Sequence, residues 1–516
     1  MEKLSTEVFS IILAHLLAQP TQERPSAYAT VARSWQHVVE AFSFASITIK
    51  SKELDSFARI FSGAGTHRRC LLRQINYNIG LPTHGDSRED HATNERAFGS
   101  AVQSLFHFLE PWNKDHDGDH NGQDQSIAWR HPNVQLHFWL SHDVDTQNAD
   151  GPVDHDFDVC NSSAARRYHT LLPEFNVPKV RCITSLGVGA TLGRALYPAT
   201  ICQIASLVPS LQSLDLTYWD PAVKRHAMRK DHRAALGNSL RALGNKLPKL
   251  ETLCIRRQDG VDPSNHSFVC SDLQEGGVDP LCDAIRHLAA NCHLKELQLE
   301  NIMISSDLFR HSPSGTSLPD ADQEFPTFLN LRRLDIKSGI LAPSGKWYYT
   351  GDPNSVEASN GDHIADDEED DDAQSDVDSS DDSGAEDNST RDRFVNGERP
   401  HHEWRTRPDP DTFNPLIQHL TEAVLKKMPS LQWARLEFGC GLDEFVGMII
   451  QCCEAGQPFV SPPGKRRKRP WVEDVTVRRC KAWVGRGSEW EVPSDVMATW
   501  REWSGASGVV ETGVWP

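Results

Sequence analysis

The sequence has no uninterrupted apolar run of 18 residues, which is about the length that a membrane-spanning helix needs. Its most apolar candidate, Phe445–Cys453, is much shorter. Met1 leads into an amphipathic segment, so we expect no signal peptide and no membrane partner. The 12 cysteines are scattered, and we expect reduced thiols in the cytoplasm, the nucleus or both.

Motifs of common catalytic sites are also missing. The chain has no P-loop Gly-Lys-Ser/Thr, no His-Glu-x-x-His and no Gly-x-Ser-x-Gly. Cys452 and Cys453 are adjacent, so they lack the Cys-x-x-Cys spacing of a zinc site. We therefore predict no catalytic residues, no metal and no cofactor, and an enzyme is the least expected class of function.

Basic residues are absent from one segment, Asp362–Asp387, which holds 14 acidic residues. The whole chain has a formal net charge of −19, so the remainder carries only −5. This concentration of negative charge says little about the folded surface, and it argues against nucleic acid as the main partner. Residues 351–411 are poor in apolar side chains, and we predict a disordered acidic insertion there.

Two charged features leave more than one interpretation open. Ser375, Ser379 and Ser383 each precede an acidic residue by three positions, a pattern typical of acid-directed kinase sites. A solvated spacer is the simpler interpretation of the same segment. The basic run Lys465–Arg469 fits a nuclear localisation signal, a solvated loop or a contact with the acidic insertion.

The polar tract Asp117–Gly122 copies the first half of an EF-hand calcium loop, with oxygen-bearing side chains at alternate positions. The twelfth position is Ala128, where such a loop needs a bidentate glutamate. Asp124 also stands where an apolar residue is usual. We therefore expect a flexible surface loop and no calcium site.

The middle of the chain carries an irregular internal repeat. In each copy a helical stretch and a polar break precede apolar residues at offsets zero, three and five. The copies are Val180/Ile183/Ser185, which is degenerate, Leu211/Leu214/Leu216, Leu250/Leu253/Ile255, Leu294/Leu297/Leu299, Leu331/Leu334/Ile336 and Leu431/Ala434/Leu436. The preceding helical stretches are Ile201–Leu207, Leu236–Leu247, Leu281–Ala290 and Ile417–Met428.

This pattern is typical of leucine-rich repeats, in which each unit buries its apolar face against its neighbours. We expect Leu214, Leu253, Leu297 and Leu334 to be buried equivalents on successive parallel strands. A non-repeating α/β domain whose helix-to-strand loops share the motif is the alternative. The tryptophan-rich C-terminal part would then cap the open end of a solenoid, or offer a surface to a partner.

Other segments show simpler periodicities. Ile75, Tyr77 and Ile79 alternate with polar residues and predict a half-buried strand within Cys70–Ile79. Ala97–Phe108 has apolar residues at helical spacing. The segment Trp471–Val477 is a further candidate strand.

The stretch Leu4–Ile49 combines two apolar stripes at helical spacing. Helices this short cannot bury both stripes alone, so they need the rest of the chain or a partner. The first stripe contains Val8, Ile11, Ile12, His15 and Leu16, and the second contains Tyr28, Val31, Trp35 and Val38.

The N-terminal stretch resembles the F-box, and more closely the F-box proteins of filamentous fungi. The residues that carry the resemblance are Leu4, Glu7, Val8, Ile11 and Ile12, followed by Val31, Arg33 and Trp35. The proline usual in the family is replaced by Ser5, which can cap the first helix instead. The resemblance implies docking on the adaptor subunit of a cullin-based (SCF-type) ubiquitin ligase through Leu4, Val8, Ile11, Ile12, Val31 and Trp35. Leu16 joins this set because it lies on the same helical face. An ordinary helical hairpin packed on the main domain is the alternative.

Together these patterns predict an α/β chain with five parts. They are an F-box-like helical module (1–50), the helix and strand start of the main domain (51–170), a leucine-rich-repeat-like region (171–350), the acidic insertion (351–411), and a last repeat with a C-terminal cap (412–516). The expected function is substrate recognition for an SCF-type ligase, with an unidentified target protein. A protein-interaction scaffold that acts outside any ligase is the second expectation.

Overall fold

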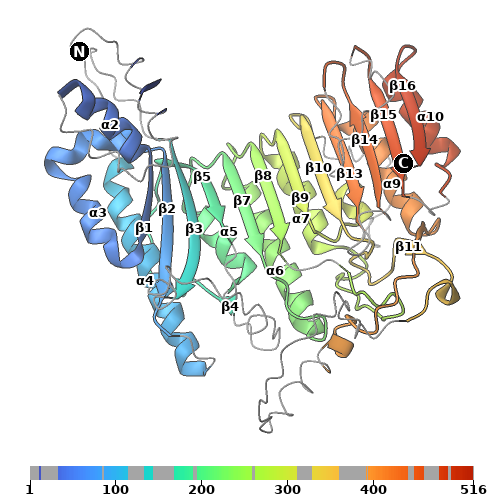
Figure 1. Cartoon of the computed structure of the whole chain (residues 1–516), viewed down its shortest axis with the longest axis horizontal. Helices are drawn as coiled ribbons and strands as arrows, with labels where there is room; N and C mark the ends of the chain where they lie inside the picture. The colour runs from blue at the N-terminus through green and yellow to red at the C-terminus, as the bar shows by residue number, and fades with distance from the viewer. Residues whose placement is uncertain are drawn as a thin grey trace, which may run out of the picture. The chain divides into compact units, whose positions relative to one another are not determined.

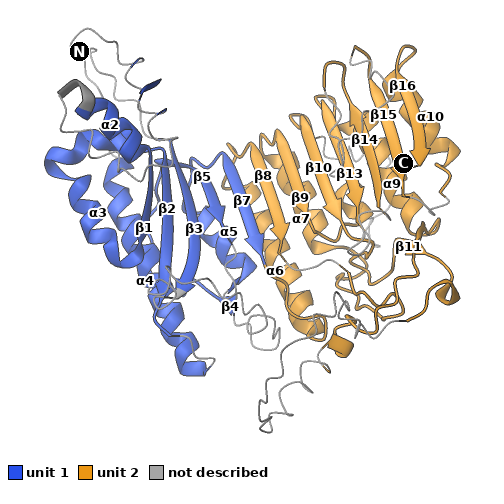
Figure 2. Cartoon of the chain, in the orientation of Figure 1, with its two compact units in different colours: residues 1–160, 165–218 blue, residues 161–164, 219–516 orange. Residues whose placement is uncertain are grey.

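The computed structural model describes residues 8, 11–12, 15, 33–83, 87–113, 133–142, 168–189, 195–258, 262–310, 328–358, 391, 393–439, 447–457, 476–485 and 490–514. These residues form a mixed α/β structure with mostly parallel strands and several helices (Figure 1). The chain divides into two compact units, coloured separately in Figure 2: residues 1–160 with 165–218, and residues 161–164 with 219–516. No helix among the described residues is both long and apolar enough to cross a membrane.

The described residues of unit 1 form five parallel strands in the order β1–β2–β3–β5–β7. A separate two-stranded sheet pairs β4 with β6. The strands are β1 (Ser46–Lys50), β2 (Gln74–Leu81), β3 (Val134–His142), β4 (Tyr168–His169), β5 (Ile183–Val188), β6 (Ala195–Leu196) and β7 (Ser213–Tyr218). The α-helices are α2 (Arg33–Ala45), α3 (Leu54–Ile60), α4 (Arg88–Leu109) and α5 (Pro198–Ala205), and the 3-10 helices are η2 (Ser51–Glu53), η3 (Gly63–Leu71) and η4 (Glu110–Asn113).

A row of apolar side chains crosses the strands of unit 1 in register. Ile75 pairs with Leu136, Leu136 with Leu186, and Leu186 with Leu214. All four side chains are buried, so the row forms one face of the unit's core. The row begins at Ile47 on β1, which means that the parallel sheet starts inside the predicted residues 1–50.

The predicted strand in Cys70–Ile79 is confirmed, with β2 starting later because residues up to Leu71 form η3. The predicted helix Ala97–Phe108 is also confirmed but begins earlier, at Arg88. A capping box sets this start: the Ser87 hydroxyl accepts from Asp90 N at 3.0 Å, and Asp90 Oδ2 accepts from Ser87 N at 3.3 Å.

In the part of unit 2 that the structure describes, seven strands follow one another in the order β8–β9–β10–β13–β14–β15–β16. The first four are parallel, β14 runs antiparallel to both neighbours, and β16 is parallel to β15. They are β8 (Thr252–Arg257), β9 (Glu296–Glu300), β10 (Arg333–Ser338), β13 (Trp433–Phe438), β14 (Met448–Cys453), β15 (Arg479–Val484) and β16 (Val509–Val514). A small antiparallel pair joins β11 (Tyr349–Thr350) to β12 (Arg407–Pro408). The helices are α6 (His226–Gly244), α7 (Pro280–Asn291), η5 (Ser306–Leu308), η6 (Pro353–Ser355), α9 (Phe413–Lys427) and α10 (Ser494–Ser504).

The predicted repeat positions are in register within unit 2. Leu253 pairs with Leu297, Leu297 with Leu334, and Leu334 with Ala434, and all four are buried. The turns before the strands also recur: Leu250 N donates to Leu247 O, Leu331 N to Phe328 O and Leu431 N to Met428 O, at 3.1–3.2 Å. The remaining predicted position, Leu214, lies in unit 1.

One copy of the repeat was assigned three residues too early. Leu186 and Val188, rather than Ile183 and Ser185, pair with Leu214 and Leu216. The copy is therefore Ile183/Leu186/Val188, and its apolar residues are buried like those of its neighbours. Ser185 instead pairs with Ser213, on the opposite face of the sheet.

The prediction of disorder throughout 351–411 is wrong at both ends, because residues 351–358, which include η6, are also part of unit 2. Residues 393–411 pack against unit 2, where Trp404 is 7% exposed. Arg405 and Trp404 supply contacts of this segment: the Arg405 guanidinium lies over the Trp347 and Trp404 rings, and Trp404 Nε1 donates to Ser267 Oγ. The tract Asp362–Asp387 itself, with its three serines, lies outside the described residues, as do the EF-hand-like tract and the basic run Lys465–Arg469.

Parallel strands connected by helices explain why α6 and α7 lie side by side. Gly237 on α6 makes the close approach possible, because an added Cβ there would lie 2.5 Å from Pro280 O at the start of α7. Near the C-terminus, the predicted strand Trp471–Val477 does not include its last two residues, since Thr476 and Val477 lie in a turn and a bend, and β15 follows at Arg479–Val484. Residues 471–475 lie outside the described residues.

Candidate functional site

The predicted docking residues are only partly described. Val8, Ile11 and Ile12 have helical backbone, and the side chains of Val8 and Ile11 are 39% and 69% exposed. Leu4, Leu16 and Val31 lie outside the described residues, as does the side chain of Trp35, whose backbone belongs to α2. The described residues therefore show two exposed apolar side chains on helical backbone, Val8 and Ile11, and the arrangement of the full predicted set lies outside them.

The second half of α2 is anchored on unit 1. Val38 and Val39 are buried, and Glu40 binds Arg68 with an N–O distance of 3.0 Å. Burial alone would raise the pKa of Glu40, but its contact with Arg68 holds the pKa below its usual value. The Arg68 guanidinium also lies 5.0 Å from the centre of the Phe44 ring, so this arginine joins α2 and η3 by charge and by a cation–π contact.

In unit 2, residues 393–411 form what we call the strap, which lies on the loop after β8. Asn265 N donates to Gly397 O at 2.9 Å, and His402 N donates to Ser264 O at 3.0 Å. His402 Nε2 lies 2.9 Å from Pro353 O and thereby also contacts the segment that follows β11. Both ends of the acidic insertion are therefore held at the same part of unit 2.

Arg405 is the centre of the strap. Its guanidinium lies 4.1 Å from the Trp404 ring centre and 5.0 Å from that of Trp347, and it donates to Tyr349 O at 3.0 Å. Arg405 N donates to His266 Nδ1 at 2.9 Å, which requires that nitrogen to be unprotonated. Burial, with the charge of Arg405 as a further cause, lowers the pKa of His266 to about 4.

The strap's anchor includes a buried carboxylate. Asp262 accepts from Ile340 N at 2.6 Å and from Leu341 N at 3.2 Å, which ties the loop after β8 to the loop after β10. Burial raises the pKa of Asp262 to about 6, although these two hydrogen bonds favour the charged form. The loop junction therefore contains two titratable side chains with opposite shifts: the pKa of His266 is lowered, and the pKa of Asp262 is raised.

Next to it lies a charged cluster of α6 and β8. Asp220 contacts Arg257 at 3.2 Å and Arg229 at 3.6 Å, and both arginines are at most 6% exposed. Burial alone would raise the pKa of Asp220, but Arg257 and Arg229 hold it below its usual value. Because Asp220 contacts both buried arginines, the cluster has the character of a structural network rather than of a ligand site.

The sheet face opposite the leucine row of unit 2 carries a mixed-charge surface. Glu300 lies between Arg256 and Lys337, at 3.1 and 3.9 Å. Arg435 contacts Glu437 on the same strand, and burial lowers the pKa of its guanidinium. A face with alternating charges of this kind complements a partner protein that presents matching polar groups better than it complements a uniformly charged partner.

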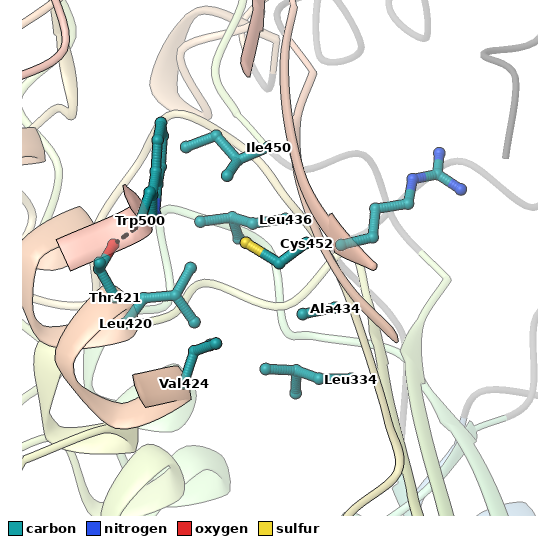
Figure 3. A pocket seen from close by; sticks show the side chains of 10 residues that line it. Leu334, Leu420, Thr421, Val424, Ala434, Leu436, Ile450, Cys452 and Trp500 are labelled. Atoms are coloured by element: carbon teal, nitrogen blue, oxygen red, sulfur yellow. Dashed lines mark hydrogen bonds between the residues drawn. The ribbon is translucent and has the colours of Figure 1, made fainter. Parts of the chain in front are cut away.

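A small cavity of unit 2 lies between the sheet and two of its helices. Its volume is about 10 Å³, and it is lined mostly by apolar side chains of α9, α10 and the sheet, including Leu420, Leu436 and Trp500 (Figure 3). It has room for about one water molecule. Among the described residues, no group of three or more His, Cys, Asp and Glu side chains could hold a metal ion.

Sequence reasoning missed the strap and the buried charged cluster. The strap had a signal, since acidic residues thin out after Asp392 while Arg393, Arg399, Trp404 and Arg405 follow. The Arg–Asp cluster had none, because its members are far apart in the sequence. A scan against models of known protein families finds no match, and a search of the curated proteins finds no significantly similar sequence.

Proposed function

We propose that this chain is a substrate-recognition subunit of a cullin-based (SCF-type) ubiquitin ligase. The N-terminal F-box-like stretch would dock on the ligase adaptor, and unit 2 would bind a target protein. No covalent chemistry is assigned to the chain itself. It acts by raising the effective concentration of the target near the ligase.

The observation that carries the proposal is the exposure of Ile11 and Val8, 69% and 39%, on a helical stretch. An aliphatic side chain gains about 1.5–3 kcal/mol on full burial, so an exposed pair on one helical face favours a partner. The spacing of these residues matches the F-box pattern that the sequence resembles.

The second support comes from the in-register rows of leucines. We interpret them as the stacked strands of an irregular leucine-rich-repeat-like solenoid, with helices filling the space between turns. Such an architecture offers a long sheet face and a row of loops to a protein partner. The mixed-charge sheet face around Glu300 and the strap around Arg405 are the candidate target surfaces of unit 2.

Affinity purification of the full chain from cells tests the proposal. The double variant Val8→Asp, Ile11→Asp places two charges on the proposed docking face and should abolish recovery of the adaptor and the cullin. The matched control is Val269→Asp with Leu329→Asp, because these side chains are 86% and 60% exposed in unit 2. The control should retain both proteins.

The outcomes separate the proposed functions. Equal recovery of the adaptor with the double variant and with the wild type would reject docking through this stretch. Recovery of the adaptor without a cullin would favour a scaffold that acts outside a ligase. The proposal places the protein in the cytoplasm or nucleus, where these ligase components could reach it.

A further inference from the structure

Two cysteines face each other across neighbouring strands of unit 2. Cys452 on β14 and Cys480 on β15 are directly opposite in the antiparallel register. Their sulfur atoms are 3.0 Å apart, and both are free thiols. Their exposed fractions are 4% and 0%, so the pair is enclosed.

The strands hold the two thiols in place from both sides. Five further residue pairs align β14 with β15, from Met448 opposite Val484 to Cys453 opposite Arg479. On its other edge, β15 pairs with β16 along its whole length. The two sulfur atoms therefore stay neighbours as long as this part of the sheet is folded.

The surroundings of Cys452 provide a small space beside the pair. Figure 3 shows its side chain among those of Leu420, Leu436 and Trp500, at the cavity of about 10 Å³. Trp500 Nε1 donates to Thr421 Oγ1 at 3.1 Å, which joins α10 to α9 over this region.

We propose that Cys452 and Cys480 form a reversible intrachain disulfide when the protein meets hydrogen peroxide. One thiol loses its proton, and its sulfur attacks a peroxide oxygen; the O–O bond breaks, a sulfenic acid forms and water leaves. The thiolate of the other cysteine attacks the sulfenic sulfur, the S–S bond forms and a second water leaves. Two electrons pass from the sulfur pair to the peroxide.

The environment sets the expected rate of this oxidation. The contact with the Cys480 thiol and burial both raise the pKa of the Cys452 thiol well above its usual value. Because the thiolate is the reactive form, the pair should react slowly at neutral pH and faster at alkaline pH or when β15 and β16 open. Once formed, the bond would join residues that are 28 positions apart and hold β15 on β14.

Adjacent Cys453 provides a matched control. Successive residues of a strand point to opposite faces, so its side chain lies on the face away from Cys452 and Cys480. It is equally buried, at 0% exposure, and pairs with Arg479 instead of with a cysteine. Cys453→Ser therefore changes the thiol content by one without removing either member of the pair.

The experiment oxidises the reduced full chain with hydrogen peroxide at pH 8.5, blocks remaining thiols and digests the protein at acidic pH to prevent thiol exchange. Mass spectrometry should detect a peptide pair joined through Cys452 and Cys480, two hydrogen atoms lighter than the free thiols. The pair should persist in Cys453→Ser and vanish in Cys480→Ser. The oxidised wild type should also melt at a higher temperature than the reduced form, with reversal by dithiothreitol.

If Cys480→Ser fails to fold, mapping the disulfides and the blocked thiols of the oxidised wild type alone decides whether Cys452 and Cys480 form the bond. The proposal is wrong if partly exposed thiols such as Cys70 are oxidised while Cys452 and Cys480 are recovered as blocked thiols. It is also wrong if Cys452 is found joined to a cysteine other than Cys480. An unchanged melting temperature after complete formation of the 452–480 bond would contradict the expected hold on β15.

Discussion

The guanidinium of Arg233 binds the carboxylate of Asp279 at two points. Nε donates to Oδ1 at 2.7 Å, and Nη2 donates to Oδ2 at 2.8 Å. Both side chains are almost completely buried, at 4% and 0% exposure. Arg233 also donates to Met303 O, and Asp279 caps α7 by accepting from Cys282 N. One ion pair thus joins α6 to the start of α7 and to the segment after β9.

Replacement of this arginine should destabilise unit 2 strongly. Arg233→Met leaves the Asp279 carboxylate buried without its main counter-ion, which should lower the free energy of unfolding by about 3–5 kcal/mol. Urea denaturation measures the loss. The control is Arg256→Met, whose partner Glu300 lies 3.1 Å away in a pair about one-third exposed, and it should cost less than about 1 kcal/mol. Equal losses in the two variants would contradict the assignment of Arg233 as a buried junction.

The leucine row makes a second prediction. Leu297→Ala creates a cavity between β8 and β10 and should lower the free energy of unfolding by about 2–5 kcal/mol. Leu329→Ala removes the same atoms from a side chain that is 60% exposed, compared with 2% for Leu297, and should stay within about 0.5 kcal/mol of the wild type. Thermal and urea unfolding of the two variants distinguish the sites, and a small effect of Leu297→Ala would argue against a shared leucine core.

The strap should respond to acid through His266. Its folded-state pKa is lowered to about 4 from an ordinary value of 6.5, so protonation favours the unfolded state. The free energy of unfolding that neutral His266 contributes is fully present above pH 6.5. About 2–3 kcal/mol of it is lost as the pH falls towards 4. Arg405 and His402 are the charged neighbours that oppose protonation.

His266→Gln isolates this contribution, because glutamine keeps an acceptor and does not titrate. The difference in unfolding free energy between wild type and variant should narrow as the pH falls from 7 to 4.5. Asp262 acts in the opposite sense, since its raised pKa gives stability at low pH that is lost above about 6, and both proteins retain it. A difference that stays constant with pH would show that His266 does not titrate as inferred.

Local sequence patterns correctly indicated several elements of this fold. The alternation of Ile75, Tyr77 and Ile79 identified β2, and the spacing of Leu253, Leu297 and Leu334 identified equivalent positions on β8, β9 and β10. Such patterns succeed because a side chain's face on a strand depends on its position in the local sequence. They failed at Val180/Ile183/Ser185, where two apolar triplets overlap and only strand pairing selects the correct register.

The amino-acid sequence by itself indicated some of the strands and helices, among them β2, α4 and the strands of the leucine row, and it showed where negative charge accumulates. The docking role of the N-terminal residues stays a prediction. Tertiary structure alone decided that residues 393–411 fold back onto unit 2, that Arg233 meets Asp279, and that Cys452 meets Cys480. These relationships join residues 28 to 172 positions apart, the longest being the hydrogen bond between Lys224 N and Asn396 Oδ1. Local periodicity carries no information over such separations, because packing and strand order choose which distant side chains become neighbours.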